Sequence, residues 1–455
     1  MGAEPGEAVT AIWSEYVAAA SLSDVPPAVI HEALRAVVNI VGCAVGGADH
    51  SAVKAIERTF SRYSGRAEAH VIGRRPRYDL LLACLLNAAS ASAHAFDDTH
   101  AEAMVHPSAP VVPAIFGIAE RDGISGGAFL TAYIIGAELT CRLSKAISVR
   151  PAKAGLAWIQ TGVCGAVGAA VAAGKLLNLK PHELRHAMGI AAAQSSGLRG
   201  LQGSMCTSFI PAHASRSGLQ AALLAQNGFT SADAGVEGKF GFLEAFSSAP
   251  NPLAVTDSLG SVFELSRNGY KPYPCGVVIH PAIDAILAIR KDNRLDPNNI
   301  RSIVARLSPV AVAVVDRSTP RNSNEAQVSA QHWIAAALVF GKAGLAEASQ
   351  YCVDDPLCTA VRTKVILNAD PQRPADSGHV SITMQDGSVI EHNVTHCVGS
   401  AQSPMTDAGL DEKFLCQTVP VLTEAHARRL KDLLWSIDSA ETVATVAAAT
   451  APTAQ

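Results

Sequence analysis

The chain has 455 residues, of which 49% are hydrophobic and 17% are charged, and its formal net charge is -4. A chain of this length and composition can bury a large core, so we expect a compact fold of two domains rather than a disordered or fibrous protein. The small net charge, without a basic run interleaved with aromatic residues, argues against nucleic acid and against an anionic membrane surface as partners. We expect small molecules, or a second copy of the chain, instead.

The ten cysteines form no CxxC pair and no dense framework, which is typical of reduced thiols inside the cell. The first five residues, Met1-Gly2-Ala3-Glu4-Pro5, carry an acid where a secretory signal needs bases. Residues 154–174 have no charged side chain and are long enough to span a bilayer, but their Gly- and Ala-rich composition favours a buried helix. We therefore expect a cytoplasmic protein without a membrane span.

In chain order, the first half of the sequence predicts a series of helices. Apolar and Ala-rich segments recur with helical spacing, and short polar, Gly or Pro breaks separate them. A loop-rich passage over 231–252 follows, and the β-branched run 300–307 then predicts a strand. The expected helices of the first half span residues 27–46, 79–95, 108–121, 126–148, 162–178, 181–197 and 212–227.

The clearest strand signal lies in the second half of the chain. Residues 379–384 and 388–394 alternate in polarity on either side of Asp386-Gly387, and Asp-Gly between two such runs predicts a β-hairpin. Helical spacing returns over 424–437. The tail 439–455 is rich in Ala and Thr with little to bury, so we expect it to be frayed.

These elements predict a mainly α fold with an α+β part. A large helical domain occupies residues 1–258 and resumes over 398–455, where it ends in the frayed tail. A smaller α+β lid domain, inserted between these two parts, covers residues 259–397.

The most informative polar segment is Phe96-Asp97-Asp98-Thr99-His100, which His106-Pro107-Ser108 follows between two apolar helical runs. It places two carboxylates, a hydroxyl and two imidazoles within about a dozen positions. Because such groups are costly to bury, they are seldom placed at the end of a core helix for folding alone. A chemical site is the first hypothesis.

Ordinary structural roles compete with that hypothesis. Asp and Thr are good N-cap residues, which accounts for one of Asp97, Asp98 and Thr99, and a histidine before Pro107 suits a helix entry. Two adjacent carboxylates repel each other, however, and this can raise the pKa of one and prepare it for proton transfer. We favour Asp98 and Thr99 as site residues, with Asp97 as a further candidate.

The six-residue spacing of His94, His100 and His106 also invites a metal interpretation. On a helix this spacing turns each side chain away from the last, and the intervening proline and loop residues do not supply a compact tetrahedral set. We expect no metal site.

Several spaced motifs, taken together, resemble the MmgE/PrpD family, whose members include 2-methylcitrate dehydratases, cis-aconitate decarboxylases and iminodisuccinate epimerases. The likeness covers nearly the whole chain. Its motifs are Asn87 with Phe96-Asp97-Asp98-Thr99-His100 and His106-Pro107-Ser108, Gly136-Ala137-Glu138 with Arg142, Thr161-Gly162-Val163-Cys164-Gly165, Gly174-Lys175-Leu176-Leu177, Gly189 to Gln194, Lys271-Pro272-Tyr273-Pro274-Cys275 with His280, and Glu325-Ala326.

The resemblance implies a helical domain with an inserted α+β lid, a homodimer, an active site in the cleft between the domains, and neither a metal nor an organic cofactor. It implies chemistry at a carbon next to a carboxylate, through a carbanion-like intermediate. His106 and His280 are then the proton-transfer groups, with Asp98 as a further acid or base. Lys271 is expected to bind a substrate carboxylate as a point charge.

Thr99, Asp97 and Tyr273 complete the set of substrate-binding residues that the resemblance implies. Cys275 is expected to pack rather than to react, because no activating base can be assigned to it.

The sequence also departs from the family pattern. Ala95 stands where dehydratases and decarboxylases of this kind usually carry a further aspartate, and Ile159 stands where they often have a histidine. The expected lysine and histidine ahead of a Gly/Ala-rich helix fall near Thr207 and Ile210. On position alone, His213 and Arg216 are candidates to replace these lost basic groups.

The leading interpretation is a cofactor-independent lyase of hydratase or dehydratase type, similar to 2-methylcitrate dehydratase, that acts on a small carboxylic acid. A decarboxylase, or an epimerase or isomerase that uses the same intermediate, stays open. So does a non-catalytic paralogue that binds an acid or a partner.

Overall fold

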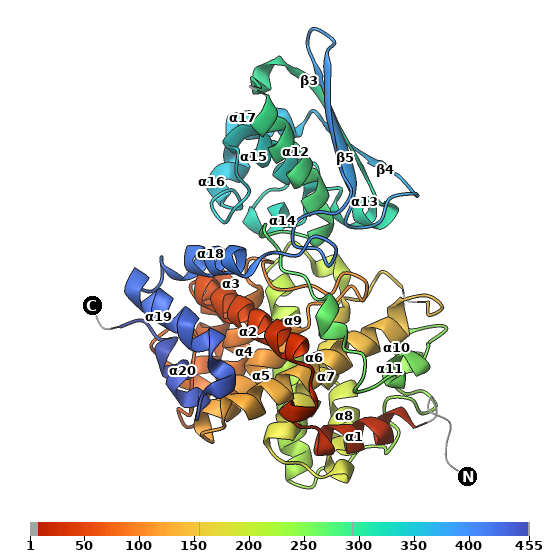
Figure 1. The fold of residues 1–455 in the computed structure, drawn as a ribbon, viewed down its shortest axis with the longest axis vertical. Coiled ribbons are helices and arrows are strands. Elements are labelled where there is room, and N and C mark those ends of the chain that lie inside the picture. Colours follow the sequence, from red (N-terminus) through yellow and green to blue (C-terminus); the bar gives the residue numbers. More distant parts are fainter. Residues whose placement is uncertain (1–7, 154, 294, 454–455) are drawn as a thin grey trace.

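The computed structural model describes residues 8–153, 155–293 and 295–453. The fold is mainly α with an α+β part, as expected. Figure 1 shows a broad helical body and a smaller body above it that carries the sheet, and the two are joined through loops. Both ends of the described chain lie on the helical body.

Helix α7 runs through the middle of the helical body and is buried along nearly its whole length. Its glycines make this possible, because a Cβ at Gly165 would meet the Pro110 ring and a Cβ at Gly168 would meet the Thr140 side chain. From Gln160 onward the charge-free stretch is thus a buried helix, as predicted. The helices before the lid are α1 (Val9–Ala19), α2 (Pro27–Gly47), α3 (Ser51–Phe60), α4 (Leu80–Ser92), α5 (Ser108–Arg121), α6 (Gly126–Ser148), α7 (Gln160–Leu176), α8 (Pro181–Ala192), α9 (Cys206–Gln226), α10 (Phe242–Phe246) and α11 (Leu253–Thr256).

Only α2, within the described residues, is both long and apolar enough to cross a membrane. In its most apolar window 78% of the residues are buried inside the protein. A buried core helix passes the same test of length and composition.

The helical body is completed from the far end of the chain. Helices α18 (Asp407–Thr418), α19 (Glu424–Trp435) and α20 (Val443–Ala449) return to it, and α18 packs against α2 while α20 packs against α5. The expectation of a frayed tail is wrong for its described part, because Val443 and Val446 are fully buried. Small apolar side chains spaced for one helical face give α20 more to bury than its Ala/Thr-rich composition suggests. Residues 454–455 lie outside the described residues.

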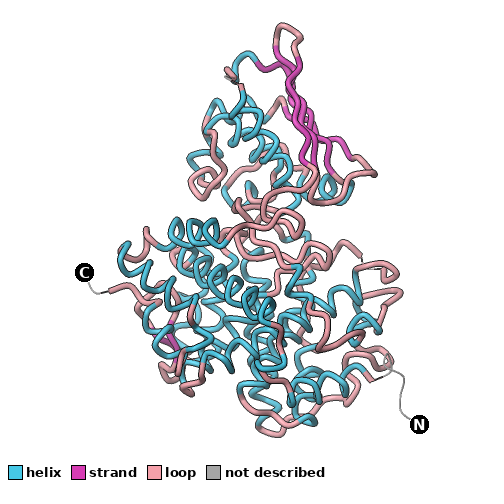
Figure 2. The backbone as a smooth tube through the Cα atoms, in the orientation of Figure 1, coloured by secondary structure: helices cyan, strands magenta, loops and turns pink. Residues whose placement is uncertain are grey.

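The second body, which we call the lid, holds a four-stranded sheet in the order β4-β3-β5-β6. Strands β3 and β4 are parallel and the other neighbours are antiparallel, and Figure 2 shows the sheet as one long twisted ribbon beside the helices. The predicted strand at 300–307 and the predicted hairpin are confirmed. Its elements are α12 (His280–Asp292), β3 (Ile300–Leu307), α13 (Pro309–Val315), α14 (Ser323–Ala326), α15 (Ala330–Phe340), α16 (Gln350–Asp354), α17 (Pro356–Arg362), β4 (Val365–Ala369), β5 (Gly378–Met384) and β6 (Val389–Val394). A further short pair, β1 (Ala69–His70) and β2 (Arg77–Tyr78), lies in the helical body.

The two chain segments that connect the bodies run side by side. The Tyr270 N–H donates to the Gly399 carbonyl at 3.1 Å. The preceding residue, Gly269, forms two backbone hydrogen bonds with Thr99. Gly399 has a φ of +85°, and a Cβ there would collide with the Tyr270 carbonyl. Only glycine combines this backbone conformation with so close an approach. The connection is therefore held by backbone geometry.

The lid also touches the helical body away from this connection. The Gln327 side chain donates to the Ala93 carbonyl at 2.9 Å, and the Arg317 guanidinium donates to the Gln202 carbonyl at 3.0 Å. Both acceptors are main-chain groups in loops next to α4 and α9. These contacts place the lid over the polar segment that follows α4.

Candidate active site

The polar segment between α4 and α5 folds inward instead of continuing the helix. Helix α4 ends at Ser92, and Ala95 has a φ of +50°, which turns the chain away from helical geometry. The pairing of Thr99 with Gly269 then fixes the segment against the connection to the lid. Asp97, Asp98 and Thr99 are all buried as a result.

Asp97 forms a buried ion pair with Lys271. The Lys271 ammonium lies 3.1 Å from the Asp97 carboxylate and also donates to the Ala95 carbonyl at 2.9 Å. Burial would by itself raise the pKa of Asp97, but Lys271 and the nearby His106 hold that pKa below its ordinary value. Two of the three ammonium protons of Lys271 are therefore donated to protein oxygens, and the third can be donated to a ligand.

Asp98 is fully buried, and it forms no ion pair with a cation of the described residues. One carboxyl oxygen accepts from the Ser108 hydroxyl and from the Asn268 amide, each at 2.6 Å, while the other has no described partner. Burial raises the pKa of Asp98 to about 6, and the negative charge of Asp97 adds to this, although the two hydrogen bonds oppose it. Asp98 is thus a carboxyl group that exchanges its proton near neutral pH.

The ring of His106 is oriented by its first nitrogen. Nδ1 lies 2.8 Å from the Asp98 carbonyl and 2.9 Å from the Thr99 hydroxyl. Because a carbonyl oxygen can only accept, Nδ1 must carry the proton, and Nε2 keeps its lone pair. Burial, and then the charge of Lys271, lower the pKa of His106. The ring is therefore neutral with a free basic nitrogen, and Thr161 fixes its backbone by accepting from the His106 N–H at 2.9 Å.

His280 enters the site from the lid, at the first position of α12. Its ring is buried, its Nε2 has no described partner, and backbone groups of Tyr273 and Cys275 hydrogen-bond to the ring. Burial lowers the pKa of His280 to about 3, and the charges of Lys271 and Lys413 lower it further. His280 is thus a second neutral imidazole in the field of the same lysine.

Tyr273 supports His280 rather than presenting its hydroxyl to the cluster. Its hydroxyl donates to the Asp284 carboxylate at 2.6 Å, and its ring lies edge-on to the His280 ring with centroids 5.3 Å apart. The interaction with Asp284 anchors the tyrosine to α12. The residue therefore positions the imidazole.

Lys413 belongs to the same cluster, although nothing in the sequence indicated it. From α18 it donates to the Phe96 carbonyl and to the Asn39 side chain, each at 2.7 Å, and its ammonium lies 4.0 Å from the Phe96 ring centroid. Burial lowers the pKa of Lys413 to about 8. Lys271 and Lys413 thus hold consecutive carbonyls, those of Ala95 and Phe96. A single lysine on a helix far along the chain gives no spacing signal.

His213 and Arg216 are not brought to this cluster by any described contact. The His213 ring stacks on Phe209 and approaches the Ser217 hydroxyl at 3.4 Å, while the Arg216 guanidinium lies over the Phe60 ring. Both lie on α9, and a backbone group of Gln194, in the loop after α8, also hydrogen-bonds to the His213 ring. Position in the sequence alone was a poor guide to where these side chains lie.

The residues that depart from the family pattern lie close to the cluster. Ala95 contributes its carbonyl to Lys271, and Ile159 ends the loop before α7. Ile210 on α9 packs its side chain where a Cβ at Gly162 or Gly197 would stand. Thr207 turns its hydroxyl toward the Gly203 N–H. An apolar wall thus replaces the expected basic groups.

His100 has a structural role. Its Nε2 lies 3.0 Å from the Glu264 carboxylate, which Lys145 also contacts, and its Nδ1 accepts from the Ala103 N–H. The described residues contain no group of three or more His, Cys, Asp and Glu side chains arranged for a metal ion.

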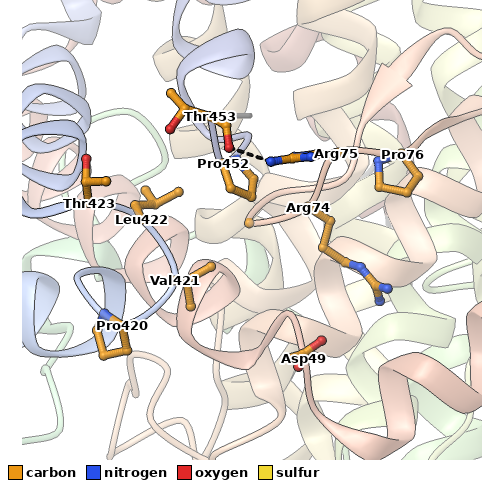
Figure 3. Close-up of a pocket in the computed structure, with 11 residues that line it drawn as sticks. Asp49, Arg74, Arg75, Pro76, Pro420, Val421, Leu422, Thr423, Pro452 and Thr453 are labelled. Carbon is orange, nitrogen blue, oxygen red and sulfur yellow. Dashed lines mark hydrogen bonds between the residues drawn. The ribbon is translucent and has the colours of Figure 1, made fainter. Parts of the chain in front are cut away.

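Two cavities at the surface lie outside the cluster. One, of about 480 Å³, lies between residues 73–76 and the C-terminal segments 420–423 and 452–453, where Arg75 donates to the Thr453 carbonyl (Figure 3). The other, of about 580 Å³, is lined by Tyr273 and Asp284 on the outer side of the lid connection. Asp97, Asp98 and His106 line neither.

Comparison with known proteins identifies the family. The model of the MmgE/PrpD N-terminal domain matches residues 12–253, and that of the MmgE/PrpD C-terminal domain matches residues 273–439. The chain belongs to the MmgE/PrpD family. The first match ends at residue 253 and the second begins at residue 273, so the gap between them lies close to where the chain passes into the lid.

Three relatives in this family match the chain over most of its length. Cis-aconitate decarboxylase of Aspergillus terreus is 28% identical, over 94% of this chain and 93% of the relative. Cis-aconitate decarboxylase-like protein oryM of Aspergillus oryzae is 26% identical, over 96% and 95%. Cis-aconitate decarboxylase of Homo sapiens is 23% identical, over 91% and 88%. Family and relatives together support a lyase-type enzyme that processes an acid.

Proposed function

We propose that this MmgE/PrpD protein is a cofactor-independent lyase that acts next to a carboxylate of a small di- or tricarboxylic acid, with decarboxylation as the leading reaction. The observation that carries the proposal is the opposite protonation of two groups in one buried cluster. His106 offers a basic Nε2, and Asp98 is a buried carboxyl group whose pKa is raised to about 6. The names of the relatives favour the loss of carbon dioxide.

In the decarboxylation, the bond between a substrate carbon and its carboxyl group breaks, and carbon dioxide leaves. The electron pair stays on the carbon and is delocalised onto the neighbouring carboxylate, which the cations of the cluster stabilise. Asp98 then gives a proton to that carbon, and solvent returns one to Asp98. His106 and Thr99 hold the acid in register, where orientation alone can remove several kcal/mol from the barrier.

Dehydration is the second candidate, and the pairing of a base with an acid favours it. His106 Nε2 would take the proton next to the carboxylate, and Asp98 would protonate the hydroxyl that departs as water. This reaction needs both groups, whereas decarboxylation needs only the acid. His280, a second neutral imidazole, is the alternative base in this reaction.

Product analysis in heavy water separates these reactions. We expect cis-aconitate to yield carbon dioxide and an unsaturated dicarboxylate that carries deuterium at the carbon that is protonated after carbon dioxide has left. A hydrated tricarboxylate without carbon dioxide would assign hydro-lyase chemistry, and deuterium exchange with inversion would assign an isomerase. Binding without conversion, across a panel of di- and tricarboxylates, would contradict the proposal and favour a non-catalytic acid-binding protein.

A further inference from the structure

Arg199 is a cation beside the cluster that no described carboxylate neutralises. It opens the short helical turn Arg199–Leu201, and its Nε and Nη2 donate to the carbonyls of Leu156 and Trp158 at 2.8 and 2.9 Å. Nη2 also donates to the Gln160 side chain at 3.0 Å. Among the described residues, all of its partners are neutral oxygens. An arginine taken partly out of water usually gains a charged partner, because neutral oxygens repay only part of the cost of desolvation.

The guanidinium is fixed in place by three acceptors, of which Gln160 is buried. Gln160, which is 1% exposed, accepts from Arg199 and is itself held by a hydrogen bond to the Ser148 hydroxyl at 3.1 Å. The Arg199 backbone N–H donates to the Ala157 carbonyl at 2.7 Å. Nη1 makes no hydrogen bond within the described residues. The planar group is therefore immobilised along one edge, and the other edge keeps its donors.

The position of Arg199 relates it to His106. Gln160 precedes Thr161, whose hydroxyl accepts from the His106 N–H, so two adjacent residues at the start of α7 contact Arg199 and His106. The positive charge of Arg199 also contributes to lowering the pKa of His106. Ile159 directly precedes these two residues, and the side chain of Ile210 packs against the next one, Gly162.

From this geometry we infer that Arg199 binds a carboxylate of the substrate, at a distance from the carbon where His106 and Asp98 act. The inference rests on the proposed function and deepens it by assigning the residue that binds the second carboxylate. The substrate is an acid with at least two carboxylates, one at the reacting end near Lys271 and one paired with the free edge of Arg199. A monocarboxylate fills only the first of these positions.

Binding of unreactive acids tests the inference without turnover. Tricarballylate, glutarate and butyrate have three, two and one carboxylates, and isothermal titration calorimetry measures their affinities for the wild type and three variants. In Arg199→Gln we expect the affinity for tricarballylate and glutarate to fall about ten- to a hundredfold, with butyrate unchanged. Arg199→Lys, which keeps the charge but loses the planar fork, is expected to restore much of that affinity.

The matched control is Arg185→Gln, which removes an arginine of α8 whose polar partners, within the described residues, are Ser14 and Glu15. It should leave all three affinities unchanged. A purely supporting role of Arg199 for the 156–160 backbone would weaken all three acids equally, lower the Tm, and leave Arg199→Lys no better than Arg199→Gln. That result, unchanged affinities in Arg199→Gln, or no binding of the polycarboxylates to the wild type would overturn the inference.

The same variants distinguish this inference from the proposed function. If Arg199→Gln converts cis-aconitate with wild-type KM, the lyase proposal stands and the inference is wrong. If the charge-dependent binding holds but no acid is converted by the wild type, the inference stands and the lyase proposal is wrong.

Discussion

Asp97 and Asp98 are neighbours in the chain, yet their surroundings move their pKa values in opposite directions. Asp97 faces the Lys271 ammonium and ionises more readily than usual, whereas Asp98 meets only a hydroxyl and an amide and has its pKa raised to about 6. Two like groups with separated pKa values are a common arrangement for acid and base assignments in enzymes. Asp97 is therefore suited to act as a fixed negative charge, and Asp98 is suited to carry a proton.

Asp98→Asn should remove a pH dependence of stability. The pKa of Asp98 rises from 3.8 to about 6 on folding, so the native state binds more protons than the unfolded state between these values. Its contribution is fully present below pH 3.8 and is lost as the pH rises through 6, on the order of 3 kcal/mol in total. Urea unfolding between pH 4 and pH 8 should show a smaller fall for Asp98→Asn. Equal slopes in both proteins would contradict the raised pKa.

The Lys271–Asp97 pair predicts strong coupling. Lys271→Met leaves a buried carboxylate unpaired and should cost about 3 to 5 kcal/mol of unfolding free energy, whereas the double variant with Asp97→Asn should cost less than the sum of the singles. Arg428→Met, which breaks an exposed pair with Glu424, is the control and should cost at most about 0.5 kcal/mol. Additive costs for the two buried residues would show that the pair does not act as a unit.

If product analysis shows dehydration, the reaction that uses His106 as a base, His106→Gln should lower kcat about 10²- to 10⁴-fold with little change in Tm, because it removes the basic Nε2 and keeps a polar side chain of similar size. Thr99→Val is the comparison, since it removes one hydrogen bond to Nδ1 while the Asp98 carbonyl still orients the ring. Its effect should be about two- to tenfold. Steady-state kinetics on the substrate found by product analysis provide both values. Full turnover by His106→Gln would rule out the assigned base.

Lys413→Met should alter stability in the alkaline range. The pKa of Lys413 falls from 10.5 to about 8 on folding, so the unfolded state binds more protons in this window, and wild-type stability rises with pH there by on the order of 3 kcal/mol. The variant should lack that rise. Lys431→Met is the control, because Asp411 raises the pKa of Lys431 instead. Chemical unfolding at pH 8 and pH 10 tests both, and an unchanged rise in Lys413→Met would contradict the shift.

Short sequence patterns predicted the helices and the hairpin whose ends depend on neighbouring residues in the chain. Asp386-Gly387 between alternating runs identified the hairpin, and α5 and α6 begin and end where the helical spacing does. The helix predicted over 212–227 misses the start of α9, which begins at Cys206 and includes Pro211. A proline near a helix start costs only one backbone hydrogen bond, and the packing of α9 outweighs it.

The site was predictable only where its residues form a motif. Asp97, Asp98, Thr99 and His106 lie within one short segment, and the structure brings Lys271 to them. Lys413 and Arg199 join the cluster through long-range packing and backbone carbonyls, which leave no periodicity in the sequence. Such partners can be found only once the chain is folded.

The return of α18 to the helical body determines when this cluster can form during synthesis. Lys413 reaches the Phe96 carbonyl from a helix made more than 300 residues later, as the separation of 317 positions shows. A ribosome-bound chain that has already released α2 to α9 still lacks this cation, and the face of α2 against which α18 will pack stays uncovered. The protein therefore acquires its complete set of site charges only after residue 413 has been made, so premature termination before that residue leaves an unfinished centre.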